Sequence, residues 1–133
     1  MVCSSLLLSK FVYSSMVGAF AKFKTGTRAP EDLDPKAKEG TKEDVEHDDR
    51  CKRICMNDLE NIPLGLLVAW GSLLCQKNNQ THMYLVAGFT GFRFLHTVCY
   101  TYKLMPWRGL AWFGGLFCTF GMAINGVMGT MEE

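Results

Sequence analysis

The chain has 133 residues, 48% of them hydrophobic, and its 14 Lys and Arg residues nearly balance its 13 Asp and Glu residues, giving a net charge of +1. Such a length and composition would suit one small soluble domain. The charges, however, are crowded between Lys22 and Arg53, and stretches of about 20 residues elsewhere carry little charge, which is the length a helix needs to cross a bilayer. The distribution argues against a soluble domain and predicts a membrane protein with no nucleic-acid partner.

Four membrane spans are expected in one domain over residues 1–133, at about 3–23, 54–75, 82–102 and 107–129. The first span contains Lys10 and several serines, and a cleaved signal peptide is the competing interpretation. Because no basic segment precedes the apolar core and no small-residue cleavage site precedes Lys22, we favour a retained helix with Lys10 facing its neighbours. The expected fold class is an all-α bundle of four transmembrane helices.

The loops differ in basic residues. The 24–53 loop is rich in Lys and Arg, and the third connection carries Lys103 and Arg108, whereas the second offers only Lys77. Basic loops face the cytosol, so both termini should lie on the other side. Residues 36–49 are of mixed sign and are expected to be a solvated connector.

Six cysteines are spread over the spans and the cytosolic segment, which does not fit a secreted disulfide framework. Cys51 and Cys55 stand four residues apart with His47 nearby, but the four ligands of a zinc site are missing. No metal is expected.

Polar side chains line one face of the second helix where it enters the membrane. Arg53, Asn57 and Glu60 stand at i, i+4 and i+7 and therefore share a face. Unpaired polar groups are costly in a membrane and usually functional. This face is the first candidate site.

The third span carries a similar stripe of Arg93, His96 and Tyr100. At about 1.5 Å per residue, Glu60 and His96 both lie about 10 Å below the cytosolic boundary, and Arg93 lies one turn deeper. Because a bundle that left either charge unpaired would be disfavoured, the pattern predicts an ion pair between Glu60 and Arg93.

In the fourth span, Pro106 is well placed as the first helical residue, so Arg108 falls in the first turn, where free N–H groups favour an anion. A lone Arg here can also be a snorkelling interfacial anchor. Together the spans predict one cytosol-facing crevice with cations, a carboxylate and hydrogen-bonding groups: Lys22, Lys52, Arg53, Arg108, Glu60, Asn57, His96 and Tyr100.

The segment Arg50-Cys-Lys-Arg-Ile-Cys-Met-Asn-Asp-Leu-Glu-Asn-Ile-Pro63 resembles the signature of the MAPEG superfamily, the membrane-associated proteins of eicosanoid and glutathione metabolism. Three more stretches agree in order, at 29–32, 93–100 and 106–112. The resemblance covers nearly the whole chain, and its Asn-Asp-Leu-Glu-Asn core is specific.

The resemblance implies a four-helix subunit in a homotrimer of the endoplasmic reticulum membrane, with the mitochondrial outer membrane as an alternative location. Glutathione would be the co-substrate, bound between adjacent subunits near the cytosolic side. Arg108 would stabilise its thiolate near Tyr100, and Asp32 matches an acid that some members need for activity. Apolar electrophiles or lipid hydroperoxides would enter from the bilayer. The implied binding positions are Lys22, Lys52, Arg53, Asn57, Glu60, His96, Tyr100, Arg108 and Trp112.

Departures from the family pattern narrow the activity. Cys55 replaces a customary His, Met56 replaces the Arg of prostaglandin E synthase-like members, and Gly109 replaces their Ser. Lys22 and Lys52 replace Arg, which removes bidentate carboxylate binding. The sequence therefore favours the microsomal glutathione transferase branch, with conjugation to hydrophobic electrophiles and hydroperoxide reduction as a second activity. Prostaglandin E synthase and a non-catalytic, lipid-presenting scaffold remain the alternatives.

Overall fold

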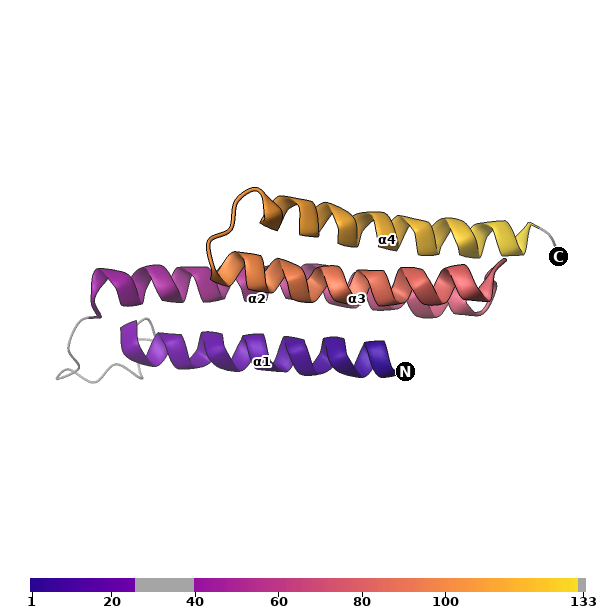
Figure 1. Cartoon of the computed structure of the whole chain (residues 1–133). Helices are drawn as coiled ribbons and strands as arrows, with labels where there is room; N and C mark the ends of the chain where they lie inside the picture. Colours follow the sequence, from indigo (N-terminus) through magenta and orange to yellow (C-terminus); the bar gives the residue numbers. More distant parts are fainter. Residues whose placement is uncertain (26–39, 132–133) are drawn as a thin grey trace.

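The computed structural model describes residues 1–25 and 40–131, and it contains four helices (Figure 1). They are α1 (Val2–Thr25), α2 (Lys42–Leu73), α3 (Asn79–Thr101) and α4 (Trp107–Thr130). Successive helices run in opposite directions, so both termini lie at one end of the bundle (Figure 1). The other end, here called the charged end, holds the last turn of α1, the start of α2 and the α3–α4 connection. The predicted all-α four-helix bundle is confirmed.

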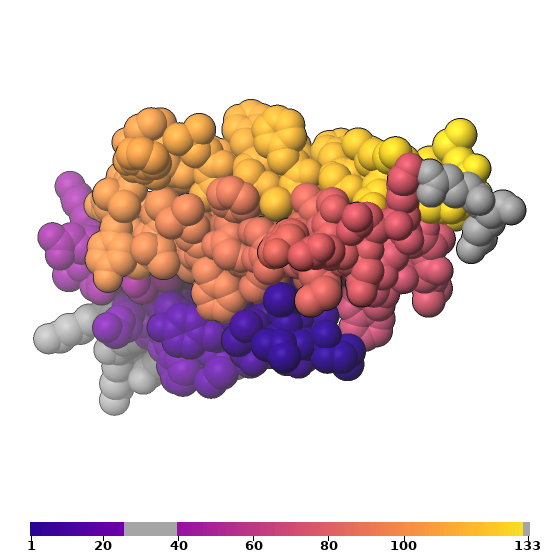
Figure 2. Space-filling model, turned by 45° about the vertical axis from the view of Figure 1, so that its right-hand side comes forward, coloured from indigo at the N-terminus to yellow at the C-terminus, as the bar shows by residue number. Residues whose placement is uncertain are grey.

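The helices are not equivalent in their packing. α2 contacts all three other helices, and α3 packs along α4 and, less closely, along α1. Figure 2 shows α3 between α1 and α4, and no contact joins the described residues of α1 to those of α4. α2 and α3 therefore form the centre of the subunit, and their inward faces can hold polar groups away from lipid.

α2 begins earlier than the sequence pattern predicts. Thr41 is its N-cap: the Asp44 amide donates to Thr41 Oγ1 at 3.3 Å, and the Thr41 amide donates to Asp44 Oδ2 at 3.1 Å. This capping box satisfies two backbone donors, and the acids of the first turn suit the helix dipole. The expected connector is thus wrong from Lys42 onward, because that segment is helical and projects beyond α3 at the charged end (Figure 1).

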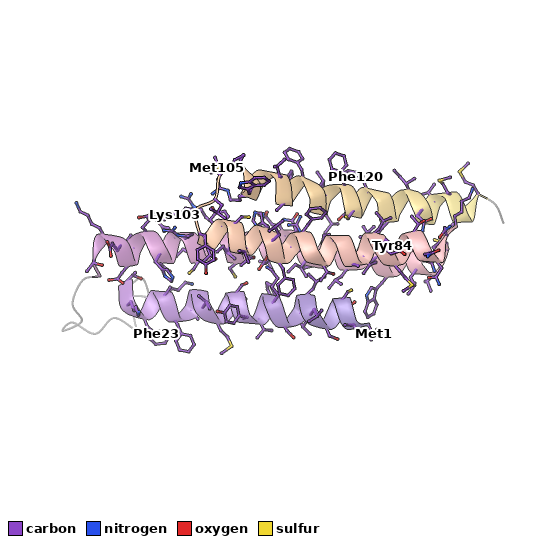
Figure 3. All side chains as sticks on the ribbon, in the orientation of Figure 1. Met1, Phe23, Tyr84, Lys103, Met105 and Phe120 are labelled. Atoms are coloured by element: carbon purple, nitrogen blue, oxygen red, sulfur yellow. The ribbon has the colours of Figure 1, made fainter. Side chains whose placement is uncertain are left out.

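Most large apolar side chains lie on the outside of the bundle, whereas several polar and charged side chains are buried beside a small apolar centre. A small apolar centre contains Leu7, Ile62 and Met122, whereas large apolar side chains such as Tyr84 and Phe120 point away from the bundle (Figure 3). Such an exterior suits lipid, and charged residues of membrane helices face the interior.

α1 and α4 are long and apolar enough to cross a membrane. α2 and α3 are less apolar overall, because α2 begins with an exposed charged segment and both helices also bury polar residues such as Asp58 and Arg93. The exact limits of the four spans stay predictions.

Candidate functional site

At the charged end, the carboxylate of Glu46 in the first turns of α2 forms ion pairs with two cations. Glu46 Oε1 lies 2.9 Å from Lys103 Nζ and 3.1 Å from Arg50 Nη2. Lys103 follows α3 and adopts a left-handed backbone conformation, with φ of 59°. The hydrogen bond from Lys103 lowers the pKa of Glu46. Glu46 thereby joins the start of α2 to the end of α3.

Beside this contact lies a cavity of about 260 Å³, here called the arginine cavity. Arg108 stacks its guanidinium over the Tyr100 ring, with Cζ 4.6 Å from the ring centroid. Arg53 of α2 lines the same cavity. The cavity has four cations against two carboxylates, so it favours an anion; its lining residues are Glu46, Asp49, Arg50, Arg53, Tyr100, Lys103, Met105 and Arg108.

Deeper in the bundle, polar groups of three helices meet in what we call the core charge cluster: Lys10, Asp58 and Arg93. Lys10 Nζ lies 2.6 Å from both carboxylate oxygens of Asp58, and both side chains are almost fully buried. Arg93 is 1% exposed, and its charge interacts with that of Asp58. Asp58 therefore pairs directly with Lys10 and attracts the buried Arg93 at longer range, and the prediction that Lys10 faces neighbouring helices is confirmed.

The predicted ion pair between Glu60 and Arg93 is wrong for the described part of this chain. Glu60 is exposed, and Arg93 donates instead to Asn57 Oδ1 at 3.3 Å and to the Trp112 carbonyl at 3.4 Å. Asp58 and Glu60 lie two residues apart on α2, about 200° around the helix, so only one can face the bundle. The carboxylate that faces inward is Asp58.

Arg93 also links two of the predicted binding residues. It bonds the side-chain oxygen of Asn57 and the backbone of Trp112, and so fixes α2 against α4 from the centre of α3. Because Arg93 uses the Asn57 oxygen, the Asn57 NH₂ group remains available to donate. His96 is buried, and its ring packs against Tyr100 at 5.7 Å between centroids.

The other predicted positions lie outside the arginine cavity. Lys22 and Glu60 are exposed, and Lys52 Nζ lies 2.8 Å from Asp48 Oδ2, a hydrogen bond that raises the pKa of Lys52. Within one chain these groups do not line one cavity, and the crevice expected between adjacent subunits stays a prediction. Glu60 and Arg108 share a site only if another surface closes it. Asp32 falls outside the described residues.

Asp58 and Glu46 are the residues that the sequence pattern missed. The buried residues of α2 recur at intervals of three and four, at Cys51, Ile54, Asp58 and Ile62. This series, continued from the apolar positions, would have placed Asp58 on the inner face and left Glu60 outside. An unpaired Lys10 in the first span was a second signal that a buried carboxylate was needed.

The chain is similar to known membrane proteins along most of its length. The model of the MAPEG family matches residues 1–128. Microsomal glutathione S-transferase 1 of Sus scrofa is 33% identical over 126 residues, which are 90% of this chain and 81% of that protein. The protein of the same name from Mus musculus is 32% identical over the same shares of both chains.

Proposed function

The chain belongs to the MAPEG family. We propose that it is a membrane-bound glutathione transferase that conjugates the glutathione thiolate to hydrophobic electrophiles. The observation that carries the proposal is the arginine cavity, where Arg53 and Arg108 converge with Tyr100. All three are positions at which the family resemblance implies glutathione contacts. Glutathione is the co-substrate in this proposal, and no metal takes part.

The cavity suits an anionic sulfur. A free thiol has a pKa of about 8.5, and neighbouring cations or a helix N-terminus lower it. Arg108 is the second residue of α4, so its guanidinium lies at the positive end of that helix's dipole. The free N–H groups expected there are not available, because the amides of Arg108, Gly109 and Leu110 donate to the Leu104 and Pro106 carbonyls. Arg108 is thus the proposed thiolate-stabilising residue, and the Tyr100 hydroxyl is the proposed hydrogen-bond donor beside it.

In the proposed reaction the thiol proton passes to water and the thiolate sulfur donates an electron pair to the electrophilic carbon. The new carbon–sulfur bond forms as the leaving group departs with the electrons of its old bond, as chloride does from a chloroarene. The protein has only to hold glutathione in its ionised form beside a substrate that arrives from lipid.

We further propose that a neighbouring subunit completes the site in a homotrimer of the endoplasmic reticulum membrane. Glu60 is exposed on a face of α2 that also exposes the apolar residues Leu59, Leu64 and Leu67. A carboxylate on such a face suits the ammonium of a ligand bound between two chains. Chemical cross-linking in detergent should give trimers, and a monomer that binds glutathione at full affinity would contradict this step.

The test of the transferase proposal is Arg108→Ala. Loss of a preorganised cationic group should lower kcat/KM for 1-chloro-2,4-dinitrobenzene by about 100-fold or more and remove the ultraviolet band of bound thiolate. The control is Lys42→Ala, which removes an exposed cation outside the arginine cavity. Full activity in the Arg108→Ala protein would refute the role of Arg108.

A substrate panel separates the alternatives. Conjugation of chloroarenes supports the transferase, while turnover of lipid hydroperoxides with glutathione adds the proposed second activity. Isomerisation of prostaglandin H2 without conjugation would indicate the prostaglandin E synthase branch. Lipid binding without any turnover would indicate a scaffold.

A further inference from the structure

A groove runs along α1, with α2 and α3 in its walls at the charged end and α3 alone opposite α1 further toward the termini. Its charged end adjoins the arginine cavity, with which it shares Glu46, Arg50 and Lys103. The groove consists of two cavities, one of about 570 Å³ at the charged end and one of about 420 Å³ further toward the termini. Tyr13, Ser14 and Thr97 line both cavities, so the two are continuous. Each volume falls in the range of about 300–1,000 Å³ that is typical of small-molecule sites. We call the two together the α1/α3 groove.

The groove is long. Its α1 lining extends from Leu6 to Val17, which is about 16 Å at a rise of 1.5 Å per residue. The part toward the termini is mostly apolar, with Leu6, Phe94 and Val98 in its walls. This shape suits one extended acyl chain rather than a compact solute.

Two hydroxyl groups in the shared wall have no protein partner. Ser14 is 5% exposed, and neither its Oγ nor the buried Thr97 Oγ1 bonds to any described residue. Helical hydroxyls commonly donate to the carbonyl one turn earlier, as Thr90 does to Val86 at 2.9 Å and Thr119 does to Gly115 at 3.0 Å. A buried hydroxyl without a partner is costly, so Ser14 and Thr97 call for a polar group in the groove.

The polar rim of the groove selects the kind of head group. Arg50 and Lys103 both pair with Glu46, and Glu43 adds a second carboxylate to the lining. The two cations and two carboxylates balance, so the rim has no surplus charge for an anion. It offers both donors and acceptors, which a neutral head group with hydroxyls can use at once.

We infer that the α1/α3 groove binds a neutral single-chain amphiphile of the monoacylglycerol type. The acyl chain lies between α1 and α3, the ester carbonyl accepts from Ser14 and Thr97, and the glycerol hydroxyls reach the charged rim. Thr97 lies six residues before Lys103, about 9 Å along the helix from the charged end, which is a suitable depth for an ester below a head group. The inference does not depend on the proposed transferase activity.

The probe is 1-monooleoylglycerol with a photoreactive diazirine in its chain, added without glutathione to the purified full-length chain in detergent. Irradiation and peptide mass spectrometry should place the label within residues 6–17 and 94–101. Unlabelled 1-monooleoylglycerol should compete, whereas oleate and lysophosphatidylcholine should compete at least several-fold less well. Label spread evenly over the lipid-facing surface, or equal competition by oleate, would overturn the inference.

Thr97→Val keeps the side-chain shape and removes the hydroxyl. It should weaken probe binding about fivefold, the effect of losing one hydrogen bond. Thr119→Val is the matched control, because its hydroxyl bonds within α4 away from the groove, and it should bind as the wild type does. Circular dichroism checks the fold, and if Thr97→Val loses helicity the comparison uses Ser14→Ala. Unchanged binding in the folded variant would contradict the proposed contact.

Discussion

The core charge cluster makes an asymmetric prediction about its members. Lys10 pairs with the carboxylate of Asp58 at 2.6 Å, and the charge of the buried Arg93 also interacts with that carboxylate. Asp58→Asn leaves two buried cations without an anion, and breaking a buried pair in this way costs about 3–5 kcal/mol. Lys10→Met removes the direct partner of Asp58 but leaves its carboxylate attracted by the charge of Arg93, so this change should cost less than Asp58→Asn. Asp58→Asn should therefore be the more destabilising change.

The double variant Lys10→Met/Asp58→Asn sharpens this test. It retains one buried cation where Asp58→Asn alone retains two, so it should be more stable than Asp58→Asn. Unfolding by sodium dodecyl sulfate in mixed micelles, followed by circular dichroism, gives the free energies of unfolding. Asp49→Asn is the control, since that carboxylate is exposed on the same helix and should change stability by less than about 0.5 kcal/mol.

The rank order of the free energies of unfolding of the three variants tests this account of the core charge cluster. If Lys10→Met were as destabilising as Asp58→Asn, the charge of Arg93 would not stabilise the carboxylate of Asp58. If the double variant were the least stable of the three, burial of unpaired cations would not be the dominant cost. Either result would refute the account of the core charge cluster.

Two further predictions follow from other parts of the bundle. Gly65→Ala should lower the free energy of unfolding by about 1–3 kcal/mol, because the added Cβ would meet the aromatic ring of Phe89 in α3. Gly91→Ala is the control: its Cβ would meet no described atom within 4 Å, so it should raise the free energy of unfolding by up to about 1 kcal/mol. Equal effects of the two changes in the unfolding titration would contradict this packing. The Glu46 carboxylate should titrate below its ordinary pKa of 4.5 in a carbon-13 NMR titration, and Lys103→Met should raise that midpoint. Because the pKa of Glu46 is lowered in the folded state, its contact with Lys103 stabilises the fold at pH values above the ordinary pKa, and this stabilisation is lost as pH falls through the lowered pKa. A titration midpoint that Lys103→Met leaves unchanged would contradict this prediction.

Several features followed from local sequence alone. The spacing of Arg93, His96 and Tyr100 predicted one helix face, and α3 carries all three. The crevice predicted from the sequence included Arg53, Tyr100 and Arg108, and these three line one cavity. The capping box at Thr41 was also present in the sequence, and its signature would have given the true start of α2.

The partner of the buried Arg was decided only by tertiary structure. The motif supplies both Asp58 and Glu60, and local spacing does not say which of them faces inward. The rotation of α2 about its axis is set by packing against the other three helices, which buries the series that contains Asp58 and turns Glu60 outward. The sequence by itself thus determined the four helices and their order, because these depend on local spacing. Which charges meet depended on helix rotation, and rotation is a property of the packed bundle.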